Sequence, residues 1–181
     1  NIHVTMMLIS YAAFSLAATF AFGCLLKLLL KREALFGAGP SMTSQQMEEF
    51  AYRLIQVGWP ILTCGVTLGA IWADTAWGRY WGWDPKETWS LITIIVYTLV
   101  THSRMIPGMK DTYTFNLLSL FAFSSVLMTY FGVNYYLSGL HSYAGGDAVP
   151  VPVFVYVSVA VLVGLAVAAG FRYRQFRQGV R

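Results

Sequence analysis

The chain has 181 residues, of which 57% are hydrophobic and 11% are charged, and its mean hydropathy is +0.58. These values are typical of an integral membrane protein and exclude an ordinary soluble globular domain. The formal net charge of +4 does not point to a nucleic-acid partner, because in a membrane protein the position of the charges is more informative than their sum.

Five apolar runs follow one another along the chain, and a bilayer core requires about 20 helical residues. We predict an all-α, polytopic transmembrane bundle that forms a single domain over residues 1–181. The five spans are expected over residues 4–30, 54–73, 84–102, 113–133 and 151–171. The linker after the first span contains a Gly/Pro/Ser segment followed by a polar helix start over residues 43–49, and it is expected to lie along the membrane surface. In the second span, Gly65 and Gly69 have the GxxxG spacing that permits close helix contact.

Cys24 and Cys64 stand singly inside apolar runs, and neither belongs to a CxxC or CxxCH motif. This pattern indicates no zinc, redox or covalent-haem site within the chain. We interpret both as small apolar packing residues.

A segment of thirteen residues, WGRYWGWDPKETW from Trp77 to Trp89, combines four tryptophans with two acids and two bases. An aromatic belt at the membrane–water interface is one explanation. The alternative is a platform for a flat apolar partner with polar edges. The order Asp84, Pro85, Glu87 favours the platform, because it predicts a helix start with Asp84 at N-cap, Pro85 at N1 and Glu87 at N3. The rings would then project from a defined backbone.

The basic residues predict the orientation, since they are enriched on the cytoplasmic side. Ten of the twelve lie in the linker, in the turn after the third span or in the C-terminal tail: Lys27, Lys31, Arg32, Arg53, Arg104, Lys110, Arg172, Arg174, Arg177 and Arg181. Arg79 and Lys86 lie near the platform. We therefore expect the N-terminus, the tryptophan-rich segment 75–89 and the loop 134–149 outside, and the C-terminus in the cytoplasm.

This orientation separates the three histidines. His3 and His141 are expected on the platform side, and His102 at the cytoplasmic end of the third helix. Two imidazoles beside tryptophans are suited to ligate a haem iron from opposite faces. Solvated surface histidines are the simpler alternative for His3 and His141. Structural zinc is a poorer fit, because no cysteine joins them.

The tryptophan-rich string resembles the "WWD" signature of haem-handling proteins of cytochrome c biogenesis, and Trp83-Asp-Pro-Lys-Glu-Thr-Trp89 is most similar to the CcsA (ResC) family of system II. The resemblance extends to His3-Val-Thr-Met-Met, Tyr52-Arg53-Leu54, Gly69-Ala-Ile-Trp-Ala73 and His102-Ser-Arg104. Members of the family usually carry further spans upstream, so the chain resembles the C-terminal core.

The resemblance implies a membrane protein that accepts haem b and attaches its vinyl groups to the cysteines of a CxxCH apocytochrome c. It implies that His3 and His141 are the external axial ligands and that His102 belongs to an earlier haem site within the membrane. It also implies a CcsB (ResB) partner. The expected location is the bacterial cytoplasmic membrane, or the thylakoid membrane in a plastid.

We expect the chain to act as a synthase (haem lyase) subunit by positioning haem, with no nucleophile of its own. Haem would contact Trp77, Trp81, Trp83, Asp84 and Trp89. Either Arg79 or Lys86 is available for a propionate, and the alternative is that both are ordinary interface charges. The alternatives are a CcmC-like delivery protein without synthase activity and a b-type electron-transfer subunit.

Overall fold

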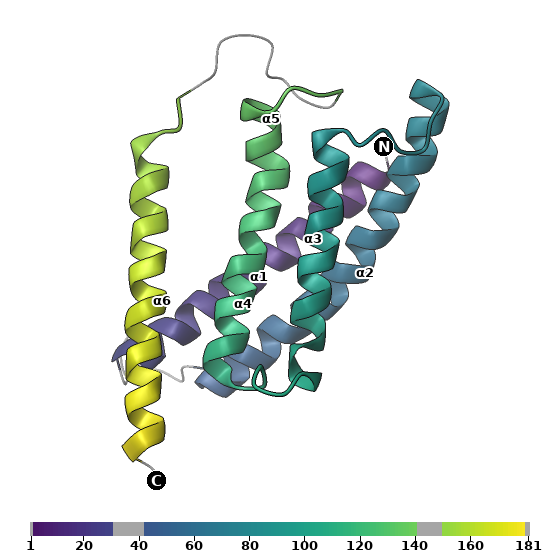
Figure 1. Cartoon of the computed structure of the whole chain (residues 1–181). Coiled ribbons are helices and arrows are strands. Elements are labelled where there is room, and N and C mark those ends of the chain that lie inside the picture. The colour runs from purple at the N-terminus through teal and green to yellow at the C-terminus, as the bar shows by residue number, and fades with distance from the viewer. Residues whose placement is uncertain (1, 31–41, 141–149, 180–181) are drawn as a thin grey trace.

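The computed structural model describes residues 2–30, 42–140 and 150–179, and over these ranges it contains helices and no strand. The elements are α1 (Ile2–Leu30), α2 (Ser44–Trp77), α3 (Pro85–His102), the 3₁₀ turn η1 (Ser103–Met105), α4 (Thr112–Leu127), the π-helical segment η2 (Met128–Gly132), α5 (Val133–Tyr136) and α6 (Val153–Gly179). The predicted all-α fold is confirmed (Figure 1).

Four stretches of the described chain have the length and apolar character needed to cross a membrane. They are Ile2–Leu30, Ser44–Trp77, Thr112–Tyr136 and Val153–Gln175. The fifth predicted span, α3, does not reach the same apolar character, since its 18 residues include Lys86, Glu87 and several threonines. The sequence of α3 therefore does not mark it as a span by itself, and the count of five stays a prediction.

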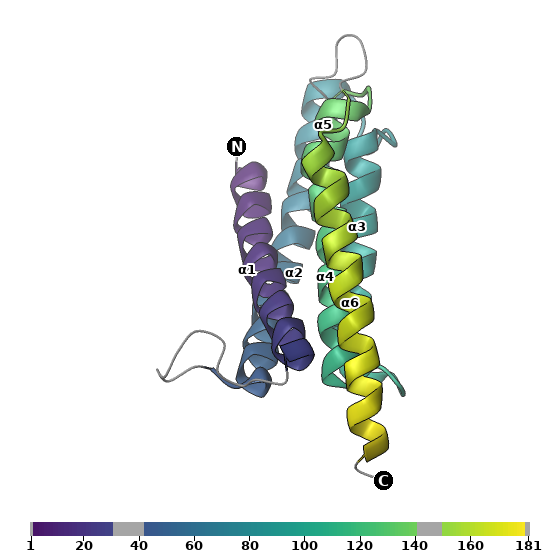
Figure 2. The ribbon, with the colours of Figure 1, turned by 90° about the vertical axis from the view of Figure 1, so that its left-hand side faces the viewer.

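The helices run between two ends of a bundle. The N-terminus, the turn between α2 and α3, and the end of α5 gather at one end (Figure 1). The C-terminal end of α6 lies at the other end, where α3 also finishes. Viewed from the side, α1 and α2 form one part of the bundle, and α3, α4 and α6 form the other (Figure 2).

Small residues on one face of α2 allow α1 to approach closely, as the GxxxG spacing predicted. A Cβ atom added at Gly65 would lie 3.1 Å from Met7, and one added at Gly58 would lie 2.8 Å from the Phe14 ring. Phe14 in turn stacks on Tyr97 of α3, with 3.7 Å between the ring centroids. This contact joins the two parts of the bundle at its centre.

The helix start predicted over residues 43–49 is confirmed, because Thr43 caps α2 in a capping box with Gln46. This polar start is continuous with the second predicted span, since α2 runs on to Trp77. One segment differs from the sequence prediction. The polar loop expected from residue 134 begins later, since η2 leads directly into the helical turn Val133–Tyr136.

The two cysteines have different surroundings. Cys24 is buried, and its sulfur lies 3.6 Å from the carbonyl oxygen of Ser44. Cys64 is exposed on α2. The packing interpretation therefore holds for Cys24 and is wrong for Cys64, which lies on the outward face of its helix.

Candidate functional site

Two helix caps shape the tryptophan-rich turn. Gly78 ends α2 in the left-handed conformation (φ 72°), and its N–H donates to the Asp74 carbonyl at 2.8 Å. Asp84 is the N-cap of α3, followed by Pro85 at the first helical position and Glu87 in the capping box. The helix start predicted from the sequence is confirmed, and the turn is held at both ends.

Glu87 organises the turn from within. One oxygen of its carboxylate accepts hydrogen bonds from two backbone N–H groups, that of Gly82 at 2.8 Å and that of Asp84 at 3.1 Å. These bonds satisfy donors that a helix start leaves unpaired. Glu87 therefore acts as a structural acceptor, as its spacing from Asp84 indicated.

The tryptophans of the segment point in different directions. Trp83 has a positive φ of 56° and is 70% exposed, and its ring meets that of Trp81 edge to face at a centroid distance of 5.9 Å. A bulky residue in the left-handed region is strained, and such strain clusters at functional sites. Trp77 instead packs edge to face against Trp72 of α2, at 5.1 Å.

Beneath the turn lies a cavity of about 170 Å³ between α1, α2, α3 and η2. Its lining comprises His3, Val4, Met7, Leu8, Tyr11, Val66, Gly69, Ala70, Trp72, Ala73, Tyr80, Trp81, Lys86, Glu87, Ser90 and Tyr130. Small-molecule pockets usually measure about 300–1,000 Å³. The cavity is therefore smaller than a usual small-molecule pocket.

His3 enters this cavity from the first turn of α1. It is half-buried, and its ring lies 5.5 Å from that of Trp72 between centroids. A Cβ atom at Gly69 would lie 3.6 Å from the imidazole Cδ2, so the small residue on α2 leaves room for the ring. His3 and Trp81 thus both line this cavity.

Among the other predicted site residues, Trp77 reaches the site through Trp72, and Trp83 lies on the outer surface of the turn. Trp89 is half-buried in α3 and does not line the cavity. Trp72 was not predicted as a site residue, although it stands in the string Gly69-Ala-Ile-Trp-Ala73 that contributes to the resemblance. The sequence did contain a sign of its role, because Trp72 lies between Gly69 and Trp77 on one helix.

His141 lies outside the described residues, but residues before it are bonded to the start of α3. The backbone N–H of Leu140 donates to Asp84 Oδ1 at 2.6 Å. Lys86 Nζ donates to the side-chain oxygen of Asn134 at 3.1 Å. Asp84 is itself buried. Both contacts connect the start of α3 to the segment that leads into the predicted ligand.

His102 lies at the opposite end of the bundle, at the last residue of α3, and is exposed. Its Nδ1 lies 2.8 Å from the Thr98 carbonyl oxygen and 3.1 Å from Thr101 Oγ1. His102 and His3 therefore do not share a site. Within the described part of the chain, no group of three or more His, Cys, Asp or Glu side chains is arranged to hold a metal ion.

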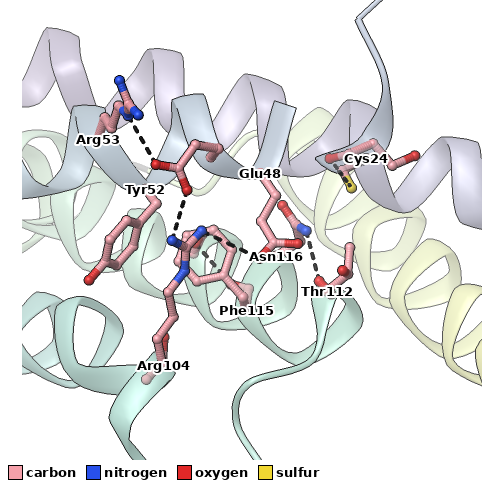
Figure 3. Close-up of polar contacts among 12 residues, drawn as sticks. Cys24, Glu48, Tyr52, Arg53, Arg104, Thr112, Phe115 and Asn116 are labelled. Carbon is pink, nitrogen blue, oxygen red and sulfur yellow. Dashed lines mark hydrogen bonds and ion pairs between the residues drawn. The ribbon is translucent and has the colours of Figure 1, made fainter. Parts of the chain in front are cut away.

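A charged cluster near His102 was not identified from the sequence (Figure 3). Arg104 pairs with Glu49 at 2.8 Å and with Glu48 at 3.6 Å, and its guanidinium carbon lies 3.9 Å from the centroid of the Tyr52 ring. Glu49 also pairs with Arg53 at 2.9 Å. The strings around Tyr52 and Arg104 contributed to the resemblance. Their contact depends on tertiary packing, because the two residues lie 52 positions apart in the chain.

Comparison with known proteins places the chain in a family. Residues 1–141 match the family described as "Cytochrome C assembly protein". The chain belongs to this family. The match spans the first four predicted spans, including the tryptophan-rich turn and both described histidines, and it confirms the resemblance to the CcsA family of cytochrome c biogenesis.

Named relatives agree with this assignment. The chain is 43% identical to "Protein NrfI" of Wolinella succinogenes over 150 residues, covering 83% of this chain and 16% of the relative. It is 45% identical over 103 residues to "Cytochrome c biogenesis protein CcsA" of Gloeobacter violaceus, and the match covers 57% of this chain and 30% of the relative. It is 37% identical over 176 residues to "Cytochrome c biogenesis protein CcsA" of Zea mays, and the match covers 78% of this chain and 54% of the relative. The chain thus spans a part of each relative's length.

Proposed function

We propose that this member of the cytochrome c assembly family holds haem b as a substrate at the platform end, for thioether attachment to a CxxCH apocytochrome c. The observation that carries the proposal is the position of His3, half-buried in a cavity that Trp81 and Lys86 also line and beside Trp72. An imidazole donor next to aromatic surface matches the chemistry of a haem site.

The residues present fit a bound haem. His3 supplies one nitrogen ligand, and we propose His141 as the second. The fixed attachment of Leu140 to Asp84 supports this role, because it starts the His141 segment at the platform. The exposed ring of Trp83 and the edge-on Trp81 offer an aromatic surface above the cavity. The proposed roles of Trp77 and Trp89 are to support this surface from behind.

Lys86 is the stronger candidate for a haem propionate. It lines the cavity, whereas Arg79 is exposed and its guanidinium lies over Gly82, where an added Cβ would be 2.8 Å from Arg79 Nε. An ammonium group in a partly buried site pairs strongly with a carboxylate. We therefore assign the propionate to Lys86 and leave Arg79 as a charge at the surface of the turn.

The proposed chemistry consists of positioning. The haem vinyl group accepts the thiol S–H of the incoming cysteine across its double bond. The chain's own residues fix the ring plane and the edge that meets the apocytochrome, and this arrangement accelerates the reaction through proximity. We propose a CcsB (ResB) partner for complete synthase activity, and His102 as a ligand at a separate haem site nearer the cytoplasm.

The proposed setting is the bacterial cytoplasmic membrane, or the thylakoid membrane in a plastid, with the platform outside. The end that carries His102 also carries most of the basic residues, which supports this orientation. A b-type electron-transfer subunit with paired histidines inside the membrane is disfavoured, because His3 and His102 lie at opposite ends of the bundle.

The test is an absorption spectrum of the chain purified with its CcsB partner, compared among His3→Ala, His141→Ala and His102→Ala variants. We expect a low-spin haem signal that falls in the His3→Ala and His141→Ala variants and returns on addition of imidazole. Ile2→Ala is the matched control, since Ile2 precedes His3 and is 74% exposed. An unchanged spectrum in the His3→Ala variant would contradict the platform site.

A second measurement separates attachment from delivery. A CxxCH apocytochrome is added, and the denatured products are examined for covalently bound haem. Haem that remains attached to the cytochrome after denaturation supports the synthase. Haem that is retained by the platform but never attached, with CcsB present, would favour the CcmC-like delivery function.

A further inference from the structure

The last turn of α3 places Nδ1 of His102 against two oxygen atoms. Nδ1 lies 2.8 Å from the carbonyl oxygen of Thr98. A carbonyl oxygen accepts hydrogen bonds and donates none, so the ring nitrogen that faces it must be the N–H. A neutral imidazole with its proton on Nδ1 has an unprotonated Nε2, which is the form that binds a metal.

Thr101 reinforces this arrangement. Its hydroxyl donates to the same Thr98 carbonyl at 2.8 Å, and its oxygen lies 3.1 Å from His102 Nδ1. Because the hydroxyl proton is directed to the carbonyl, the oxygen is available to accept from Nδ1–H. Both neighbours of Nδ1 are therefore acceptors.

Helix α2 fixes this turn from the side. The carbonyl groups of the final turn of a helix lack partners within the helix, and the Tyr52 hydroxyl donates to that of Thr101 at 3.1 Å. The Arg104 guanidinium lies against the Tyr52 ring and pairs with Glu49 at 2.8 Å (Figure 3). The backbone next to His102 is thus held by a side chain 49 residues earlier.

We propose that Thr98 and Thr101 are positioning residues that hold His102 in the Nδ1–H form and present Nε2 as a metal-binding nitrogen, with Tyr52 keeping their turn in place. Histidines that bind metals usually donate their other ring N–H to a carbonyl or carboxylate group in this manner. The inference rests on the proposed function only in that haem iron is the metal it would serve.

The test uses nitrogen-15-labelled histidine. The sequence contains three histidines, so a full chain with His3→Gln and His141→Gln, purified through a histidine-free tag, reports on His102 alone. Long-range proton–nitrogen spectra are recorded in detergent at about pH 8, above the usual imidazole pKa. We expect a protonated Nδ1 and an unprotonated Nε2. A protonated Nε2, or two nitrogens averaged as in free histidine, would overturn the proposal.

Two variants test the positioning residues. Thr101→Val removes an acceptor from Nδ1, and Tyr52→Phe removes the bond to the Thr101 carbonyl, so both are expected to shift the two nitrogen resonances towards their average. Thr67→Val is the matched control, because it deletes a similar hydroxyl bond, to the Thr63 carbonyl at 2.9 Å, in α2. Resonances unchanged in both test variants would contradict the positioning role.

Ferric haem is then added to the same His102-only chain. Haem uptake with loss of the unprotonated Nε2 resonance supports both the inference and the haem role of His102. An Nδ1–H form that takes up no haem would support the positioning inference and contradict the haem assignment of His102. A failure of the positioning inference can therefore be told apart from a failure of the haem assignment of His102.

Discussion

The Asp84 carboxylate connects the start of α3 to a residue 56 positions later, the backbone N–H of Leu140, at 2.6 Å. Its second oxygen accepts from the Lys86 N–H at 3.2 Å. Gly139 leaves room for this contact, since a side chain there would collide with the carboxylate. One buried side chain therefore caps a helix and holds the segment that leads to His141.

We expect Asp84→Ala to destabilise the protein by about 1–2 kcal/mol, because loss of an N-cap costs about 1 kcal/mol and loss of the bond to the Leu140 N–H, in a residue that is 52% exposed, adds about 1 kcal/mol or less. Asp84→Asn keeps an acceptor oxygen and is expected to lose less. The measurement is unfolding in mixed micelles followed by circular dichroism. Equal losses in the two variants would show that the contact with Leu140 contributes little.

Lys86→Gln is expected to weaken haem binding by about ten- to a hundredfold, since a hydrogen bond to a charged group contributes about 1.5–3 kcal/mol. Arg79→Gln, its control in the same turn, should bind as the parent does. Titration with haem and with its propionate dimethyl ester measures the effect. If the two ligands lose affinity equally in the Lys86→Gln variant, Lys86 does not contact a propionate.

Gly65→Val is expected to displace the first turn of α1, because an added Cβ already lies 3.1 Å from Met7 and 3.4 Å from the His3 carbonyl oxygen. The displacement would move His3 and reduce low-spin haem without removing any ligand. Gly164→Val in α6 is the control, because an added Cβ there meets nothing within 4 Å. If the Gly65→Val variant retains as much haem as the Gly164→Val control, close packing of α1 against α2 is not required for haem binding.

Arg104→Gln is expected to cost about 1–2 kcal/mol, because it removes two carboxylate partners and a contact with the Tyr52 ring. Arg53→Gln should cost about 0.5 kcal/mol or less, since its pair with Glu49 lies at a side chain that is 73% exposed. Unfolding of both variants at low and high salt measures the difference. Similar losses would mean that Arg104 acts as an ordinary surface charge.

The orientation can be measured with single cysteines in a Cys24→Ala, Cys64→Ala background. Ser138→Cys lies at the exposed platform end, and Met105→Cys lies at the opposite end, where Met105 is 75% exposed. We expect an impermeant thiol reagent added outside to label the first and not the second. The reverse pattern would invert the proposed topology.

Local features of the fold followed from local sequence. Asp84, Pro85 and Glu87 predicted the start of α3 because a helix N-terminus needs acceptors within three residues. Gly65 and Gly69 predicted close packing of α2 against another helix because small residues let backbones approach. The helix start at residue 43 was also predicted, and the capping box of Thr43 and Gln46 begins α2 about three turns before its apolar part.

The all-helical membrane character, the capped start of α3 and the family could be read from the amino-acid sequence, because they depend on composition, capping and motif order. Packing between helices brings Trp72 and Lys86 to the cavity that His3 lines, leaves Trp89 outside it, and brings Arg104 to Glu48 and Glu49. Such contacts join helices far apart in the chain. Which face each helix turns to its neighbours depends on side-chain packing, and the nearly uniform apolar pattern of α1 and α4 gives no sign of it.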